Sequence, residues 1–234
     1  MNKTLIATAT YNEIRNIEEL IYKINTVKIK KDILVIDDNS PDKTWLKLLK
    51  LKKKYRNLNV IIRKKKDGLD SAHKKMYTFA KKNNYDYLIT MDADLSHDPK
   101  IIPIFLKNIK NYDCVIGSRY TKGGKNGLTG FRFLLSKYGN ILIKYTLKIN
   151  LNEFTTSYRC FNLKKLKKFH FNQVAVSGYS FFMFVMYLLN KLNFSIKEIP
   201  ITFHERTHGQ SKIPKIETFR TLLTLLLIKI GYFK

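Results

Sequence analysis

Two aspartates, Asp92 and Asp94, are separated by a single residue in the string DADLSHDP. In an extended segment alternate side chains point to the same side, so both carboxylates can face one ligand. Mg²⁺ typically binds one or two carboxylates and completes its shell with phosphate oxygens. This spacing therefore indicates a site for a divalent cation and a diphosphate. For a DxD alone, an acidic loop without metal is the simpler interpretation, so the site needs support from other residues.

Cationic side chains that suit a diphosphate occur in two further strings. Arg119 lies in GSRY, and Arg206, His208 and Lys212 lie in HERTHGQSK. Arginine binds phosphate oxygens through a planar fork, whereas lysine acts as a point charge. Because the chain has 44 Lys and Arg residues, a solvated surface position is the simpler interpretation for any one of them alone. His97, beside the proline-containing end of the DxD loop, is expected to be a structural hydrogen-bonding group.

The elements that must position these residues follow from short β-branched runs that alternate with helical periods. Strands are expected at 4–8, 33–36, 60–62 and 87–91, with helices between them. This order is typical of a parallel sheet with crossover helices, in which ligands bind beyond the carboxyl ends of the strands. Asp37 and Asp38 follow such a strand, and adjacent carboxylates there repel each other unless a donor or cation offsets them. Asp42 is instead expected to cap a helix.

The second half of the chain continues the mixed pattern. A strand is expected at 114–116, a helix at 131–149, a strand at 156–161, a helix at 179–192 and a strand at 194–203. The segment 216–232 has an apolar body between basic residues, which suits a helix packed on the domain or lying at a membrane surface. We expect one catalytic domain over 1–213, and a C-terminal amphipathic helix over 214–234 that belongs to it or docks on a membrane.

Composition narrows the class of protein. The 234 residues are 44% apolar and carry a net charge of +26, which fits a globular chain and favours acidic partners, although genome-wide compositional drift explains the charge equally well. The two cysteines have no metal-ligand spacing, the N-terminus does not resemble a signal peptide, and no apolar run reaches the roughly 18 residues of a membrane span. A cytoplasmic location is therefore expected.

Several strings in this chain occur in the order and approximate spacing of one enzyme family. They are TYNEIRN, DDNSPDKT, GLDSA, MDADLSHDP, GSRYTKGG, TTSYRCF, SGYSF and ITFHERTHGQSKI. Over essentially its whole length the chain resembles the dolichol-phosphate mannosyltransferases of glycosyltransferase family 2. The resemblance implies an α/β GT-A (Rossmann-like) fold with a mostly parallel central sheet. It also implies transfer of a hexose, with inversion, from a nucleotide diphosphate to a polyisoprenyl phosphate such as dolichyl or undecaprenyl phosphate.

The resemblance also assigns roles, motif by motif. The nucleotide pocket would contain Thr10, Tyr11, Glu13, Asp37 and Asp38; the sugar and diphosphate would lie beside Asp92 and Ala93; the phosphates would be held by Arg119, Arg206 and Lys212. Asp94 would be the main ligand of Mg²⁺ or Mn²⁺, with Ser96 as a weaker one. Asp92, Asp94 and Arg119 are thus the expected catalytic group. No general base is needed, because a phosphate monoester is already ionised near neutral pH.

The lipid acceptor implies a membrane partner. We expect peripheral attachment to the cytosolic face, helped by the positive charge, with the tail helix and the loop bearing Leu128, Phe131 and Phe133 as contacts. A membrane-anchoring partner subunit is an open alternative. A helical face shared by Arg132, Ser136 and Asn140 is either part of that contact or an ordinary polar surface. GDP-mannose is the leading donor and UDP-glucose the alternative.

The chain departs from the family pattern at several positions: Phe182 and Phe184 replace a Gln and a Glu, Ala9 a proline, Asp70 a glycine, Glu153 an Asp and Thr156 a glycine. Asp70 is expected to be a helix N-cap. The loss of the Glu at position 184 leaves open a non-catalytic protein that binds sugar nucleotides or lipid. A nucleic-acid-binding protein is disfavoured, because no helix-turn-helix, zinc-finger or RNP-like string is present.

Overall fold

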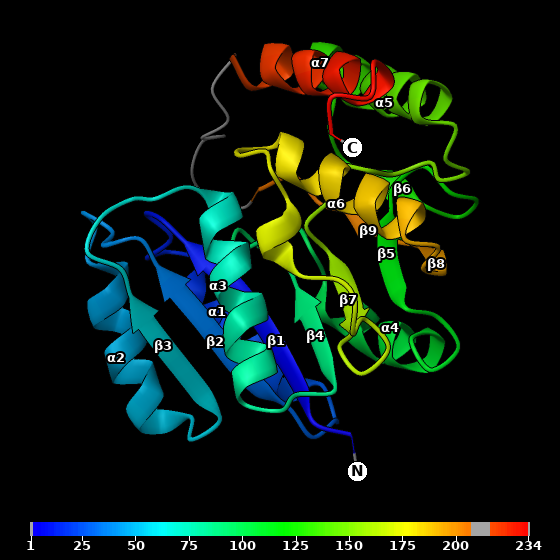
Figure 1. Cartoon of the computed structure of the whole chain (residues 1–234). Helices are drawn as coiled ribbons and strands as arrows, with labels where there is room; N and C mark the ends of the chain where they lie inside the picture. The colour runs from blue at the N-terminus through cyan, green and yellow to red at the C-terminus, as the bar shows by residue number, and fades with distance from the viewer. Residues whose placement is uncertain (1, 207–215, 234) are drawn as a thin grey trace.

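A computed structural model describes residues 2–206 and 216–233 of the chain. A seven-stranded sheet runs through its centre, with helices on both faces (Figure 1). The strands occur in the spatial order β3, β2, β1, β4, β7, β5, β8. Their bounds are β1 (Thr4–Thr10), β2 (Asp32–Asp37), β3 (Leu58–Ile62), β4 (Tyr87–Thr90), β5 (Cys114–Ser118), β7 (Arg159–Asn162) and β8 (Ile196–Pro200).

The sheet is parallel except at β7, which pairs antiparallel with β4 and β5. The expectation of a mostly parallel α/β sheet is therefore confirmed. β2 is the continuous apolar run Ile33 to Ile36, and all four side chains are buried, as both faces of a parallel sheet require. A separate parallel pair, β6 (Lys125–Asn126) with β9 (Thr202–Phe203), ties the glycine-containing loop to the segment that leads to Arg206.

The helices divide into two groups, one on each face of the sheet. α1 (Ile17–Thr26), α2 (Thr44–Lys54) and α4 (Ile102–Asn108) share a core with one face, and α3 (Leu69–Lys82) and α6 (Ser180–Lys191) share a core with the other. Side chains of β1 alternate accordingly, because Leu5 and Ala7 join the second core and Ile6 joins the first.

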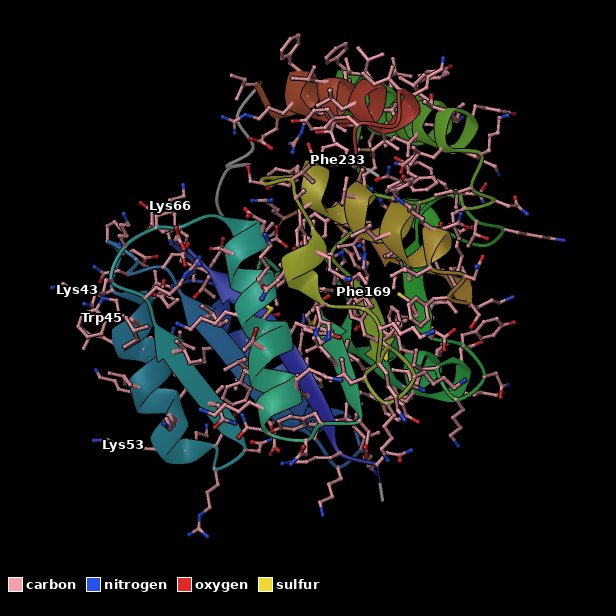
Figure 2. All side chains as sticks on the ribbon, in the orientation of Figure 1. Lys43, Trp45, Lys53, Lys66, Phe169 and Phe233 are labelled. Atoms are coloured by element: carbon pink, nitrogen blue, oxygen red, sulfur yellow. The ribbon has the colours of Figure 1, made fainter. Side chains whose placement is uncertain are left out.

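Two further helices form an outer layer above α6. α5 (Gly130–Leu147) packs beside α7 (Ile216–Lys229), and α7 packs on α6 (Figure 1). Beyond α7, the ring of Phe233 meets that of Phe184 edge to face, with centroids 4.8 Å apart (Figure 2). Within the described part of the chain, no helix combines the length and apolar character that crossing a bilayer requires.

Two expectations about helix starts have different outcomes. Asp42 lies one residue before the N-cap position of α2, which is Lys43, but it does hold the start of the helix, because its Oδ1 accepts hydrogen bonds from the backbone N–H and the hydroxyl of Thr44, at 2.9 and 2.6 Å. The N-cap role expected for Asp70 is wrong. Gly68, with φ at +85°, precedes α3, and Asp70 lies within its first turn. The Asp70 Oδ1 instead accepts from the backbone N–H of Gly178 at 3.1 Å, which joins α3 to the start of α6.

Candidate active site

Asp94 lies beyond the carboxyl end of β4 and is almost fully buried. Its Oδ1 accepts hydrogen bonds from the Ser96 backbone N–H at 3.1 Å and the Ser96 hydroxyl at 2.6 Å. Its Oδ2 lies 2.8 Å from Nε of Arg206, which arrives from the segment after β9. The DxD loop and the start of HERTHGQSK, more than a hundred residues apart in sequence, therefore meet at one carboxylate.

Asp92, the first carboxylate of the pair, has a different environment. Its side chain is 33% exposed, and its Oδ1 accepts from the hydroxyl of Ser157 at 2.6 Å. The Asp92 backbone N–H donates to Nδ1 of His97 at 3.1 Å. Nδ1 is therefore an acceptor, and the imidazole proton belongs on Nε2, which faces the hydroxyl of Thr156 at 3.4 Å. This confirms the structural role expected for His97.

The buried imidazole of His97 lies among several charged side chains of the site. Burial lowers the pKa of its imidazole, Arg119 lowers it further, and the carboxylates of Asp92, Asp94 and Glu153 act in the opposite direction. Burial prevails, so the ring stays neutral near pH 7. It stacks on the ring of Tyr158 at 4.8 Å. A neutral, wedged imidazole fixes the backbone of the DxD loop without adding a charge.

Arg119, expected to hold phosphate, follows β5 and is paired with Glu153. Its Nε and Nη2 donate to the two carboxylate oxygens of Glu153 at 2.7 and 2.8 Å, and Nη2 also donates to the hydroxyl of Thr155 at 2.9 Å. Both side chains are buried. Burial alone would raise the pKa of Glu153, but the charge and hydrogen bonds of Arg119 outweigh it and hold that pKa below its ordinary value. Arg119 and Glu153 thus form a bidentate ion pair that is shielded from water.

Asp37 is fully buried and is fixed by protein groups. Its Oδ2 accepts from the hydroxyls of Thr10 and Ser40 at 2.8 and 2.7 Å, and its Oδ1 accepts from the Ser40 backbone N–H at 2.9 Å. The Ser40 hydroxyl oxygen in turn accepts from the backbone N–H of Asn12 at 3.0 Å. Asp37 thus ties the loops after β1 and β2 together, and its expected contact with the nucleotide stays a prediction.

Replacing Asp37 by alanine is expected to lower the free energy of unfolding by about 3 kcal/mol, because two hydroxyls and a buried backbone N–H lose their acceptor. Urea unfolding measures the change. Glu19→Ala, which removes an exposed i,i+4 ion pair with Lys23, is the control and should cost under about 0.5 kcal/mol. A variant of unchanged stability that no longer binds nucleotide would make Asp37 a ligand contact instead.

Asp38, one residue further along, faces an arginine that sequence reasoning missed. Nε and Nη2 of Arg63 bind the Asp38 Oδ1, and Nη2 of Arg63 also donates to the carbonyl oxygen of Gly68 at 2.9 Å. Burial raises the pKa of Asp38 above its ordinary value, although Arg63 opposes the change. Arg63 follows β3 directly, so the rule that strand ends deliver site residues could have singled it out.

The remaining residues expected at the nucleotide end lie on the loop after β1. Nζ of Lys66 lies 4.3 Å from the centre of the Tyr11 ring, a cation–π contact between the loops after β1 and β3. The Glu13 Oε2 accepts from the side-chain amide of Asn16 at 2.7 Å, just before α1 begins. Ala93 is buried between the two aspartates. His208 and Lys212 lie outside the described residues.

Tyr179, just before α6, is a second residue that the sequence did not single out. Burial raises the pKa of its phenol, and the neighbouring charges that affect it are Asp92, Arg206, Asp94 and Glu217. The phenol therefore belongs to the same surroundings as the two aspartates. Its backbone N–H donates to the Glu217 Oε2 at 2.8 Å, which connects the site to the start of α7. Tyr179 lies in SGYSF, one of the strings that resemble the family, but no neighbouring residue distinguishes it from an aromatic side chain of the core.

The two phenylalanines that replace polar family residues are packed in aromatic surroundings. Phe182 lies edge-on to His73 and under the guanidinium of Arg159, whose Cζ is 5.2 Å from the ring centre. Arg159 is buried, its Nε has no hydrogen-bond partner, and burial lowers its pKa to about 10. Phe184 contacts Tyr187 and Phe233. Aromatic packing thus takes the place of polar groups on this side of α6.

The donor atoms beyond the end of β4 determine whether a divalent cation fits there. Among the residues that the structure describes, no cluster of three His, Cys, Asp or Glu side chains could hold a metal by itself. One or two carboxylates supplemented by substrate phosphate oxygens is nonetheless the usual arrangement for Mg²⁺. Asp94 offers such a carboxylate, with Asp92 one residue away, so the donor set fits a cation that binds together with a diphosphate.

Carboxylates at the end of β4, a buried arginine fork after β5 and a seven-stranded, mostly parallel sheet together define a glycosyltransferase of the GT-A fold. The chain belongs to glycosyl transferase family 2, whose sequence model matches residues 5–169. The resemblance drawn from the motifs is therefore confirmed at the level of the family.

Curated relatives of similar sequence are named as polyprenyl-phosphate mannosyltransferases. The undecaprenyl-phosphate mannosyltransferase of Micrococcus luteus is 33% identical, over 90% of this chain and 87% of that protein. The dolichol-phosphate mannosyltransferase of Pyrococcus furiosus is 35% identical, and the match covers 90% of this chain but 59% of that protein. The polyprenol monophosphomannose synthase of Mycolicibacterium smegmatis is 33% identical over 90% and 81% of the two chains.

Solved structures support the fold. Glucosyl-3-phosphoglycerate synthase from Mycobacterium tuberculosis, in complex with Mn²⁺, UDP and phosphoglyceric acid, superposes with a TM-score of 0.70 over 98% of this chain and 79% of that chain, at 13% identity. The same enzyme with Mg²⁺ and UDP gives a TM-score of 0.67 at 15% identity, over 98% and 80% of the two chains. At such identity the likeness shows the fold alone, and it confirms the GT-A architecture.

Proposed function

We propose that this chain transfers mannose from GDP-mannose to a polyisoprenyl phosphate, with inversion at the anomeric carbon, at the cytosolic face of a membrane. The observation that carries the proposal is the ion pair of Asp94 with Arg206 beyond the end of β4, two residues from the partly exposed Asp92. Two carboxylates beside a guanidinium suit a ligand that brings both a cation and phosphates. The names of the three relatives support mannose and a polyprenyl phosphate as the reactants.

The acceptor supplies its own nucleophile. An ionised oxygen of the lipid phosphate forms the new bond to the anomeric carbon, while the bond from that carbon to the nucleoside diphosphate breaks and its electron pair leaves with the diphosphate. No side chain has to remove a proton. The enzyme's contribution is then to hold the two reactants in line and to stabilise the charge of the departing diphosphate.

The residues of the site divide these tasks. Asp94, with Asp92 beside it, would hold Mg²⁺ or Mn²⁺, which when bound neutralises charge on the diphosphate. Arg206, which now binds the Asp94 carboxylate, would turn its guanidinium to a phosphate. Arg119 contributes positive charge fixed by Glu153. Lys212 would add a further cation, Ser96 would hold the Asp94 carboxylate in place, and Thr10, Tyr11, Glu13 and Asp38 would surround the nucleotide.

Transfer of a radiolabelled sugar into the lipid phase tests this proposal. The purified chain is offered GDP-mannose or UDP-glucose, each with Mg²⁺ or Mn²⁺ and a polyprenyl phosphate in detergent. We expect the mannose label to enter the lipid phase, and chelation by EDTA to stop it. Omitting the polyprenyl phosphate is the control. Transfer from UDP-glucose alone would replace the proposed donor, and no transfer from either donor would support a non-catalytic, ligand-binding relative.

A further inference from the structure

β7 runs antiparallel to both of its neighbours, β4 and β5, and lies between them (Figure 1). Its amino-terminal end therefore meets the carboxyl ends of β4 and β5, at the edge where ligands bind in sheets of this kind. The register pairs Arg159, the first residue of β7, with Thr90 at the end of β4. The segment 153–157, directly before β7, is thus brought to the same edge as the DxD loop.

Contacts of its backbone fix this segment in place. The Phe154 N–H donates to the Oδ1 of Asn140 at 2.7 Å, and the Phe154 carbonyl oxygen accepts from Nη2 of Arg159 at 2.8 Å. At the other end of the segment, the Thr90 hydroxyl donates to the carbonyl oxygen of Ser157 at 2.5 Å. Asn140, Arg159 and Thr90 are all buried, so the Ser157 side chain starts from a rigid backbone.

The hydroxyl of Ser157 is directed at the first aspartate of the DxD pair. It donates to the Asp92 Oδ1 at 2.6 Å, and Ser157 is itself buried. Among the described residues, no group donates to the Asp92 Oδ2, which lies 3.8 Å from Nδ1 of His97. That nitrogen is an acceptor as well, because the Asp92 backbone N–H donates to it. Oδ2 is therefore the oxygen that Asp92 retains for a ligand.

Asp94 has a matching arrangement. The Ser96 hydroxyl donates to its Oδ1, also at 2.6 Å, and its Oδ2 lies beside the guanidinium of Arg206. Each aspartate of the pair thus has one oxygen bound by a serine hydroxyl. Ser96 is close to Asp94 in the sequence, whereas Ser157 reaches Asp92 from 65 residues away. The structure therefore presents both carboxylates as ligands with one available oxygen.

The number of available oxygens bears on the choice of cation. Mg²⁺ requires a nearly ideal octahedron and usually takes only one or two carboxylates beside phosphate oxygens and waters. Ca²⁺ accepts more oxygen ligands in a looser geometry and often takes both oxygens of one carboxylate. A carboxylate with one oxygen bound to a hydroxyl suits the first cation and hinders the second.

We propose that Ser157 is a positioning residue, whose hydroxyl fixes the Asp92 carboxylate so that Oδ2 alone faces the ligands and Ca²⁺ is disfavoured. Ser157 acts through Asp92 and does not touch the substrate. The inference rests on the proposed function for the presence of a cation with a diphosphate at this edge. Binding of the cation can nevertheless be measured without any sugar transfer.

Competition between cations tests the inference on the full chain with GDP present. Electron paramagnetic resonance gives the affinity for Mn²⁺, the probe used in place of Mg²⁺, and Ca²⁺ is added as the competitor. In Ser157→Ala, Mn²⁺ should bind about tenfold more weakly, because a hydrogen bond to a charged carboxylate is lost. Ca²⁺ should bind as in the wild type or more tightly, so the preference for Mn²⁺ should fall by at least about tenfold.

Two further variants separate the hydroxyl at this position from packing and from hydroxyl loss in general. Ser157→Cys fills nearly the same volume but offers a weak donor, and it should lose the preference for Mn²⁺ as Ser157→Ala does. Ser195→Ala removes a hydroxyl that donates to the Asp113 Oδ2 at 2.7 Å, just before β5 and thus at the opposite edge of the sheet. It should bind both cations as the wild type does. An equal loss of affinity for Mn²⁺ and Ca²⁺ in Ser157→Ala would make Ser157 a support of the fold only, and would overturn the inference.

A double-variant comparison tests whether Ser157 acts through Asp92. In the background of Asp92→Ala, the additional change Ser157→Ala should alter the Mn²⁺ affinity by less than about twofold, because the carboxylate that the hydroxyl positions is already absent. A further tenfold loss in that background would show that Ser157 acts by another route and would contradict the inference.

The result is distinguishable from a failure of the proposed function. If the wild type transfers no sugar but Ser157→Ala loses the preference for Mn²⁺ over Ca²⁺, the proposed function fails and the inference stands. If the wild type transfers sugar and Ser157→Ala keeps the wild-type preference, the inference alone fails. A wild-type chain that binds no Mn²⁺ in the presence of GDP would overturn both.

Discussion

Asp94→Asn is expected to reduce sugar transfer about a thousandfold while the fold is preserved. The amide keeps an acceptor oxygen for Ser96, whose N–H and hydroxyl hold the wild-type Oδ1 at 3.1 and 2.6 Å. It has no negative charge to offer a divalent cation or Arg206, which binds the other oxygen at 2.8 Å. Loss of one group that stabilises charge in the transition state commonly costs two to three orders of magnitude.

A second measurement separates cation binding from catalysis. In the presence of GDP, binding of Mn²⁺ followed by electron paramagnetic resonance should weaken strongly in Asp94→Asn. Asp98→Asn is the matched control, because Asp98 lies in the same loop and its Oδ1 accepts from the Lys100 backbone N–H. That variant should keep transfer within about twofold of the wild type, as expected for a peripheral loop group. Wild-type turnover by Asp94→Asn would remove this residue from the metal site.

The convergence of strand ends was accessible from the sequence because it depends on local patterns. The alternation of buried strands and helices over the first hundred residues is enough to bring Asp37, Asp38 and Asp92 to one edge. What each carboxylate does there depends on partners that the pattern does not contain. The Asp37 carboxylate accepts hydrogen bonds from Thr10 and Ser40, whereas the Asp92 carboxylate stays partly exposed beside Ser157.

Long-range pairings are the part that sequence reasoning could not supply. Glu153 follows α5, 34 residues after Arg119, and nothing in its own surroundings marks it as the partner of a buried guanidinium. The periodicity of α5 and α7 was visible, but helices that are apolar on several sides have no unique inner face. Contacts such as that of Asn140 with the backbone N–H of Phe154 show which side of α5 is attached.

Glu153→Leu is expected to lower the free energy of unfolding by about 3 to 5 kcal/mol, which for a chain of this size corresponds to roughly 10 °C in Tm. The cause is not the lost attraction alone. Arg119 is buried and would keep a charge with no carboxylate beside it, since Nε and Nη2 both donate to Glu153 at 2.7 and 2.8 Å. Thermal unfolding followed by circular dichroism measures the change.

The same pair gives the wild type a defined response to acid. The folded-state pKa of Glu153 is depressed, so the pair stabilises the fold fully above the unfolded-state value and loses that contribution as the pH falls through the lower folded-state value. Wild-type stability should therefore fall in the range below about pH 4.5, and Glu153→Leu should lack this part of the decline. A decline of equal size in both proteins would assign the acid response to other carboxylates.

The double variant Arg119→Leu, Glu153→Leu separates the structural role of the pair from its role in transfer. Removing both charges abolishes the unpaired cation, so most of the stability lost in Glu153→Leu should return. Sugar transfer should stay at least a hundredfold below the wild type, because the double variant lacks the charge that we propose stabilises the departing diphosphate. If the double variant is stable and transfers sugar at the wild-type rate, Arg119 serves the fold alone, and the phosphate contacts must come from Arg206 and Lys212.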